Sequence, residues 1–236
     1  MTTKELPVEP DYLGDVRALV FDLDGTLIDS ADDIMYRMRH TFAELGVGAL
    51  PENYRTGNLH GTTAGIMQTI AGDMGWRAPA DVTPWVECYQ RTATMFGHQS
   101  TKLYPGVLDV LQACRDRFGL AICTNKVHAG AISVTRHFGI HDYFDAISGM
   151  DTWPQAKPSP VPLLETIRLL GVSPAQCLYF GDTEVDAECA QRAGVRFVWH
   201  TAGYGGNAPS RYPCHHAFDR WGDLLAGLSV PSGRRG

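Results

Sequence analysis

The run Phe21-Asp22-Leu23-Asp24-Gly25-Thr26-Leu27 decides how this chain folds, because an apolar strand breaks there into acids and a glycine turn. Two carboxylates so close in sequence repel each other, and a buried carboxylate without a partner is very costly. The run therefore predicts a positive group beside Asp22 and Asp24, for which a divalent metal with oxygen ligands is the usual candidate. An isolated Asp-Gly pair more often marks an ordinary turn. Polar groups at the ends of later apolar runs favour the metal site.

The composition is that of an ordinary globular protein. The 236 residues suffice for one large domain, or for a domain with a smaller insertion. A net charge of -6 without a basic stripe argues against nucleic acid as a partner. No apolar run reaches the roughly 18 residues that span a membrane, and residues 1–10 are polar, unlike a secretory signal. We therefore expect a cytoplasmic protein that contacts no membrane, as a monomer or homodimer.

The cysteines do not form a recognisable pattern. Six of them are scattered along the chain, mostly within apolar runs, which predicts buried free thiols rather than disulfides. The run Cys214-His215-His216 lacks a second ligand pair at metal spacing, so it does not predict a zinc site.

Apolar runs alternate with segments of helical periodicity. Strands are expected at residues 16–21, 120–123, 146–148, 177–180 and 195–199, with helices at residues 106–118 and 162–170 among those between them. Continuous apolar strands that alternate with helices favour a parallel sheet covered on both faces. The fold class is therefore α/β, with a Rossmann-like, doubly wound parallel sheet as its core.

The segment between the first and second strands is too long for one crossover. It carries helical patterns only, with helices expected at residues 62–71 and 83–96. An earlier helix should begin at Ser30-x-x-Asp33, which resembles a capping box, and stop at Gly46. We expect an inserted helical cap at residues 31–100, a core of residues 1–30 and 101–236, and a return hinge at residues 102–106.

Polar residues follow four of the expected strands. They are Asp22 and Asp24, then Thr124-Asn125-Lys126, then Lys157, then Asp182 and Asp186. In an open parallel sheet, ligands bind beyond the carboxyl ends of the strands. This set could hold one metal and one phosphate at a single edge.

Each of these residues also has a local explanation. Thr124, Asn125, Asp182 and Ser30 could cap helices, and Lys157 could be a solvated lysine. The order and placement of the whole set favour a common site, because the local explanations would have to coincide four times.

These motifs resemble those of haloacid-dehalogenase-superfamily phosphatases. The D-x-D-G-T motif spans residues 22–26, a strand ending in Thr124 follows, and Lys157 and the G-D-x-x-x-D motif at residues 181–186 complete the order. The helical insertion is similar to the cap that this superfamily places after its first motif. Thr124-Asn125-Lys126, Lys157-Pro158 and Thr201-Ala202-Gly203-Tyr204-Gly205 resemble the phosphoglycolate phosphatase-like branch.

The resemblance implies a mechanism and a role for each motif residue. Asp22 would attack phosphorus to form an aspartyl-phosphate, and Asp24 would act as the acid and then the base. Mg2+ would be held by Asp22, the Asp24 carbonyl and Asp182. Thr124 and Lys157 would bind the phosphoryl oxygens, Asn125 the substrate, and Asp186 would orient Lys157 or a metal-bound water. Dehalogenases of this superfamily lack the second carboxylate of the motif, so the presence of Asp24 favours a phosphatase.

The substrate is expected to be a small phosphorylated metabolite, with 2-phosphoglycolate first. Arg55, within the expected cap, is the candidate for a substrate carboxylate or second phosphate, since arginine forks match such groups; it could also be a surface arginine. Three alternatives remain. The protein could be another small-phosphate hydrolase (a sugar phosphatase, nucleotidase or pyrophosphatase), a phosphomutase, or a binding protein that kept the fold.

Overall fold

The computed structural model describes residues 14–56, 59, 61–206 and 211–228. The N-terminal stretch at residues 1–10, and Gly57, Asn58 and His60 of the expected cap, lie outside the described residues. No helix among the described residues is both long and apolar enough to cross a membrane.

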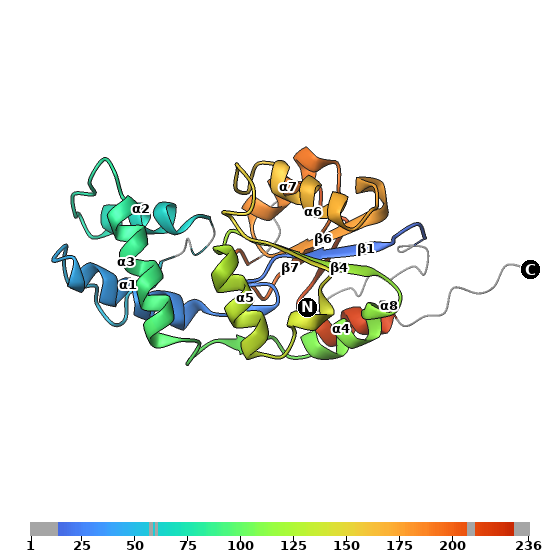
Figure 1. The fold of residues 1–236 in the computed structure, drawn as a ribbon, viewed down its shortest axis with the longest axis horizontal. Coiled ribbons are helices and arrows are strands. Elements are labelled where there is room, and N and C mark those ends of the chain that lie inside the picture. The colour runs from blue at the N-terminus through green and yellow to red at the C-terminus, as the bar shows by residue number, and fades with distance from the viewer. Residues whose placement is uncertain (1–13, 57–58, 60, 207–210, 229–236) are drawn as a thin grey trace, which may run out of the picture.

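The centre of the molecule is a parallel sheet of six strands in the order β5-β4-β1-β6-β7-β8 (Figure 1). The strands are β1 (Ala18–Phe21), β4 (Gly119–Cys123), β5 (Ala146–Ser148), β6 (Cys177–Gly181), β7 (Arg196–His200) and β8 (His216–Phe218). The chain runs from β1 outward through β4 to β5, then returns to the other side of β1 as β6. The carboxyl end of β1 is therefore the topological switch point, where open sheets bind ligands.

The two faces of the sheet are covered by different helices, because successive strand residues point to opposite faces. In β1, Leu19 and Phe21 pack with α4 (Val107–Arg115), α5 (His128–His137) and α8 (Trp221–Leu228). Ala18 and Val20 pack on the other face with α6 (Val161–Leu169) and α7 (Glu184–Ala193). Figure 1 shows α6 and α7 above the sheet, and α4 and α8 below it. The predicted doubly wound fold is confirmed.

A separate hydrophobic cluster joins three helices beside the sheet, at the left of Figure 1. These helices are α1 (Ala31–Glu44), α2 (Thr63–Asp73) and α3 (Thr83–Phe96). Their buried side chains include Met38, Phe42, Met67 and Trp85, which make no part of either sheet cluster. We call α1–α3 the helical unit; the domain boundaries at residues 31 and 100 stay a prediction.

Two short strands connect the helical unit to the sheet. β2 (Ile28–Asp29) leads out and β3 (Lys102–Leu103) leads back, and the two pair antiparallel. The first two residues of the expected return hinge, Lys102 and Leu103, therefore form one strand of a two-stranded antiparallel ribbon. The sequence did not predict β2, β3 or β8, because β2 and β3 have only two residues each and β8, His-Ala-Phe, is not a continuous apolar run.

The prediction for the cysteines is partly wrong. All six are free thiols, and five are buried, but Cys214 is exposed. It lies in a polar segment just before β8. The two histidines that follow it, His215 and His216, are not buried either.

Candidate active site

The site lies at the carboxyl ends of β1, β4 and β6. Asp22 follows β1 directly, Thr124 follows β4 and Asp182 follows β6, because parallel strands place these ends at one edge. Gly25 makes this approach possible. Its φ of 87° is in the left-handed region, and a Cβ there would lie 2.2 Å from an Asp182 carboxylate oxygen. Glycine is thus required where the first loop crosses Asp182.

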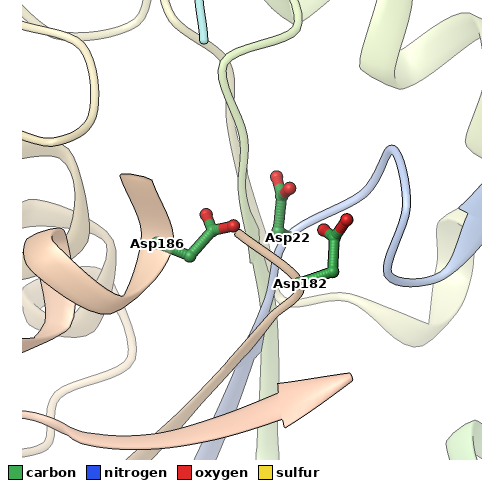
Figure 2. Close-up of side chains that lie close together, drawn as sticks. All are labelled: Asp22, Asp182 and Asp186. Atoms are coloured by element: carbon green, nitrogen blue, oxygen red, sulfur yellow. The ribbon is translucent and has the colours of Figure 1, made fainter. Parts of the chain in front are cut away.

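Three carboxylates meet at this edge. One oxygen atom each from Asp22, Asp182 and Asp186 lies within 4.8 Å of the others, and all three residues are buried (Figure 2). Asp182 is the most enclosed, at 0% exposure. Its two oxygens accept hydrogen bonds from the Thr26 hydroxyl, at 2.9 Å, and from the Tyr204 backbone, at 2.7 Å. Asp186 extends toward the group from the first turn of α7.

Lys157 is the one ammonium in contact with this group among the described residues. Its Nζ lies 2.8 Å from Asp22 Oδ1 and 2.5 Å from Asp186 Oδ1, and it donates to the Tyr179 hydroxyl at 2.8 Å. Although burial alone would lower the pKa of Lys157, the charges of Asp186 and Asp22 raise it above its usual value. The lysine is therefore a fixed positive charge beside Asp22.

The pKa values of the three acids are shifted in different directions. Burial raises the pKa of Asp22 to about 6, against the charge of Lys157. Burial and then the Asp186 and Asp22 charges raise the pKa of Asp182 well above its usual value. Burial acts in the same direction on Asp186, but Lys157 outweighs it and holds that pKa below the usual value. Three carboxylates thus share one lysine, and the excess negative charge suits a divalent cation.

Asp24 belongs to a different network from Asp22. Its oxygens accept from Lys126 Nζ at 2.8 and 2.9 Å and from the Ser30 hydroxyl at 2.5 Å. Burial raises the pKa of Asp24, but the Lys126 charge and these hydrogen bonds outweigh it and leave the pKa below its usual value. Its side chain is thus not part of the acidic triad, and the Asp24 carbonyl as a metal ligand stays a prediction.

Asn125 and Asp186 hold Lys157 in place. The Asn125 amide donates to the Lys157 carbonyl at 3.1 Å and accepts from the Lys157 backbone at 3.0 Å. These two hydrogen bonds give Asn125 a positioning role; it also lines the cavity, and its contact with substrate stays a prediction. Asp186 accepts from Lys157, as expected.

A cavity of about 540 Å³ joins these residues to the helical unit. Asp22, Asp24, Thr124 and Lys157 line one side, and residues of α1 and α3 line the other, including Arg37 and Tyr89. The sequence placed Lys126 at this edge without giving it a role, and it did not predict Arg37 or Tyr179 as residues of the site. Lys126 carried a signal, since it follows Thr124 by two residues at a strand end; Tyr179, inside a strand, carried none.

Arg55 is not brought to this cavity. Its side chain is 57% exposed and lies 3.5 Å from the carboxylate of Asp32, which is 69% exposed. It also donates to the carbonyl groups of Glu52 and Tyr54. The prediction that Arg55 contacts the substrate has no support in this arrangement, because the residue lies in a surface loop outside the cavity lining.

The fold and the acidic edge are typical of one class of hydrolase, and similarity to known proteins indicates the same class. The family model of haloacid dehalogenase-like hydrolases matches residues 19–200, and this chain belongs to that family. A phosphoglycolate phosphatase from Cereibacter sphaeroides is 36% identical over 220 residues, which cover 89% of this chain and 98% of the relative.

Solved structures are also similar. A protein from Haemophilus somnus, described as a predicted phosphoglycolate phosphatase, superposes with a TM-score of 0.80 at 25% identity, covering 90% of this chain and 97% of the other. CbbY from Rhodobacter sphaeroides, in complex with xylulose-(1,5)-bisphosphate, superposes with a TM-score of 0.76 at 25% identity, over 91% of this chain and 100% of the other.

Proposed function

We propose that this protein is a Mg2+-dependent phosphatase that hydrolyses a small phosphomonoester through an aspartyl-phosphate on Asp22. The single observation that carries the proposal is the division of the two neighbouring acids. Asp22 lies with two further carboxylates and Lys157, whereas Asp24 lies apart in its own network. Similarity to phosphoglycolate phosphatases makes 2-phosphoglycolate the first substrate to test.

The donor set fits a magnesium ion. Asp22 and Asp182 offer carboxylate oxygens, which a hard cation prefers, and Asp24 offers its backbone carbonyl. Burial, followed by the charges of neighbouring carboxylates, raises the pKa values of Asp22 and Asp182 in the absence of a cation, and a divalent ion at this edge would favour their ionised forms. When bound, Mg2+ would neutralise these acids and polarise the phosphoryl oxygens. Asp186 is a further candidate ligand, although Lys157 and Thr183 already engage its oxygens.

Asp22 is the nucleophile in this proposal. Its carboxylate attacks phosphorus, the bond from phosphorus to the leaving oxygen breaks, and an acyl phosphate forms on Asp22. Lys157, 2.8 Å from Asp22 Oδ1, offsets the charge that the phosphoryl group brings to the acids. Water then attacks this intermediate and releases phosphate, which regenerates Asp22.

Asp24 transfers the protons. It donates one to the leaving oxygen and later removes one from the attacking water. The contact with Lys126 favours the ionised form, which is the form that accepts the proton of water. Donation to the leaving oxygen therefore requires that this ion pair loosens when the substrate enters.

Thr124 is placed to bind a phosphoryl oxygen. Its hydroxyl accepts a hydrogen bond from the Lys126 backbone at 3.2 Å and, within the described part of the chain, donates to no protein group. It lines the cavity beside Asp22. A donor without a partner at this position suits an anionic oxygen.

A phosphatase for a sugar bisphosphate is the second candidate function. The cavity of about 540 Å³ exceeds what a two-carbon substrate needs, and CbbY has been solved with such a bisphosphate. A cytoplasmic location and a monomeric or homodimeric state remain predictions from the sequence.

The test is a panel of phosphorylated metabolites assayed for free phosphate with and without Mg2+. We expect Mg2+-dependent release, with 2-phosphoglycolate among the best substrates. Release from bisphosphates alone would favour the second candidate, and isomerisation without release would indicate a mutase. No release from any compound would overturn the phosphatase proposal.

A further inference from the structure

Arg37 is a buried charge within the cavity. It lies on the inward face of α1, between Ile34 and Met38, and is only 4% exposed. Together with Tyr89 of α3 it lines the same cavity as Asp22 and Lys157. A single ligand in this cavity can therefore touch both the acidic edge and the arginine.

The guanidinium is only partly satisfied by the protein. Its Nη2 donates to the carbonyl of Gly97, and its second polar partner is the Tyr89 hydroxyl, whose ionised form the guanidinium charge favours. Its Nε is buried and has no hydrogen-bond partner in the described structure. Both partners are neutral groups, since burial raises the pKa of Tyr89 to about 12.

The other cations of the cavity are all paired with acids. Lys157 contacts Asp22 and Asp186, and Lys126 contacts Asp24, each within 2.9 Å. Among the described residues, no carboxylate oxygen lies close enough to the Arg37 guanidinium, within 4 Å, to form an ion pair. Arg55 and Arg91 each have such a partner. Among the cavity cations of the described residues, Arg37 is thus the one without a carboxylate in contact; its charge lowers the pKa of Asp24, but from beyond ion-pair distance.

A buried charge without a contacting partner of opposite sign is costly, so its retention in the fold favours a ligand group that supplies this contact. An anionic ligand group would supply that partner and would engage the vacant Nε. Guanidinium donors match carboxylate and phosphate oxygens in pairs. The Tyr89 hydroxyl could donate to the same anion.

We propose that Arg37, assisted by Tyr89, binds the anionic group at the end of the substrate opposite the phosphoryl group, and so selects for doubly anionic substrates. This inference rests on the proposed function and narrows its substrate class to phosphate esters that carry a carboxylate or a second phosphate. The chemistry shared by these two classes is an anion with paired oxygens.

A purely structural role is the alternative, in which Arg37 only fixes the end of α3 through the Gly97 carbonyl. The two roles differ in their substrate dependence. Loss of a structural contact impairs all substrates alike, whereas loss of an anion site impairs only those with a charged second group.

The kinetic test compares 2-phosphoglycolate with 2-hydroxyethyl phosphate, which has nearly the same size but no charge on its second group. We expect Arg37→Met to lower kcat/KM for 2-phosphoglycolate about 10- to 100-fold, mainly through KM, and to change that for 2-hydroxyethyl phosphate less than about threefold. Arg37→Lys should retain part of the preference. Equal losses for both compounds, or no loss for either, would overturn the proposal.

Arg39→Met is the matched control. Arg39 lies on the same helix and donates to the carbonyl groups of Pro51 and Glu52, but it does not line the cavity. It should leave the ratio between the two compounds unchanged. Thermal unfolding of both variants checks that the fold is intact.

A binding experiment separates this inference from the proposed function. Calorimetric titration of Asp22→Asn, with and without Arg37→Met, uses two pairs of compounds with Mg2+ present. One pair is 2-phosphoglycolate and 2-hydroxyethyl phosphate; the other is fructose 1,6-bisphosphate and fructose 6-phosphate. A preference for the doubly anionic member of either pair that disappears with Arg37→Met supports the inference, even if nothing is hydrolysed. Equal binding within both pairs by Asp22→Asn contradicts it, even if the enzyme is a phosphatase.

Discussion

One residue separates Asp22 from Asp24, and their carboxylates have opposite surroundings. Burial dominates at Asp22 and raises its pKa to about 6, whereas Lys126 and Ser30 keep the pKa of Asp24 below its usual value. Groups whose environments push their pKa values apart are suited to different steps of a reaction. The two acids therefore cannot replace each other.

Substitution of the two acids should have unequal effects. Asp22→Asn should abolish turnover because the amide is no nucleophile, and Asp24→Asn should lower kcat roughly 10²- to 10⁴-fold through lost proton transfer. Phosphate release by each variant, with the exposed Asp116→Asn as control, provides the measurement. Near-normal rates for Asp22→Asn would contradict the proposed mechanism.

Lys126 should control the protonation of Asp24. Lys126→Met removes the charge that lowers the pKa of Asp24, so that pKa should rise. Since the ionised form removes the proton of water, the acidic limb of the kcat profile should move to higher pH. The pH profile of kcat measures this, and the exposed Lys102→Met should not change it. An unmoved limb would show that Lys126 does not set this pKa.

The acidic edge was predictable at this scale because polar residues at parallel strand ends must meet. Asp22, Thr124, Lys157 and Asp182 all lie there. Arg37 was overlooked although it occupies the apolar stripe of its own helix, three residues after Ile34 and one before Met38. An arginine within a buried stripe is a usable signal. The place of Arg55 could not be predicted, because a loop side chain has no periodicity to orient it.

At the scale of elements, the start of α1 differs from its prediction. Ser30 is the N-cap residue, but its side chain makes no capping hydrogen bond. Its backbone, at φ -118° and ψ 9°, is outside the extended conformation usual for that position. The Ser30 hydroxyl turns to Asp24 instead, so the capping-box prediction was wrong.

Asp33, in the first turn of α1, binds the segment that leads from α3 back to β3. It is 6% exposed and accepts from the backbone of Ser100 and Thr101 and from the Thr101 hydroxyl, at 3.0, 2.9 and 2.5 Å. Asp33→Ala leaves these donors unpaired and should destabilise the protein by roughly 2–4 kcal/mol. Urea unfolding measures this change. The exposed neighbour Asp32→Ala should cost less than about 1 kcal/mol, and equal costs would refute a special role for Asp33.

At the scale of the whole molecule, the doubly wound sheet follows from the continuous apolar runs, and the two covering helices with predicted bounds, α4 and α6, lie within a few residues of those bounds. β1 begins at Ala18 rather than at residue 16, and α4 ends at Arg115 rather than at residue 118. The short strands β2, β3 and β8 depend on long-range pairing that no local pattern encodes. The switch point at β1 was not predicted, because it depends on the strand order, which only the structure gives.

The sheet edge also links metal binding to the stability of the whole protein. Folded-state pKa values of Asp22 and Asp182 lie above the ordinary value of 3.8 in the metal-free protein. The native state then binds more protons than the unfolded state between that value and about 6. Stability from these groups is therefore present at low pH and is lost as the pH rises through the folded-state values.

Mg2+ should reverse this loss, because it competes with protons for the same oxygens. At pH 7.5 and about 100 times its Kd, it should stabilise the protein by roughly 3 kcal/mol, and at pH 5 by clearly less. Thermal unfolding at the two pH values measures the difference, with NaCl at equal ionic strength as the control. Asp182→Asn should reduce the effect at pH 7.5, because it removes one charge from the edge. An equal increase in Tm at both pH values, or one that survives Asp182→Asn unchanged, would place the ion somewhere other than this edge.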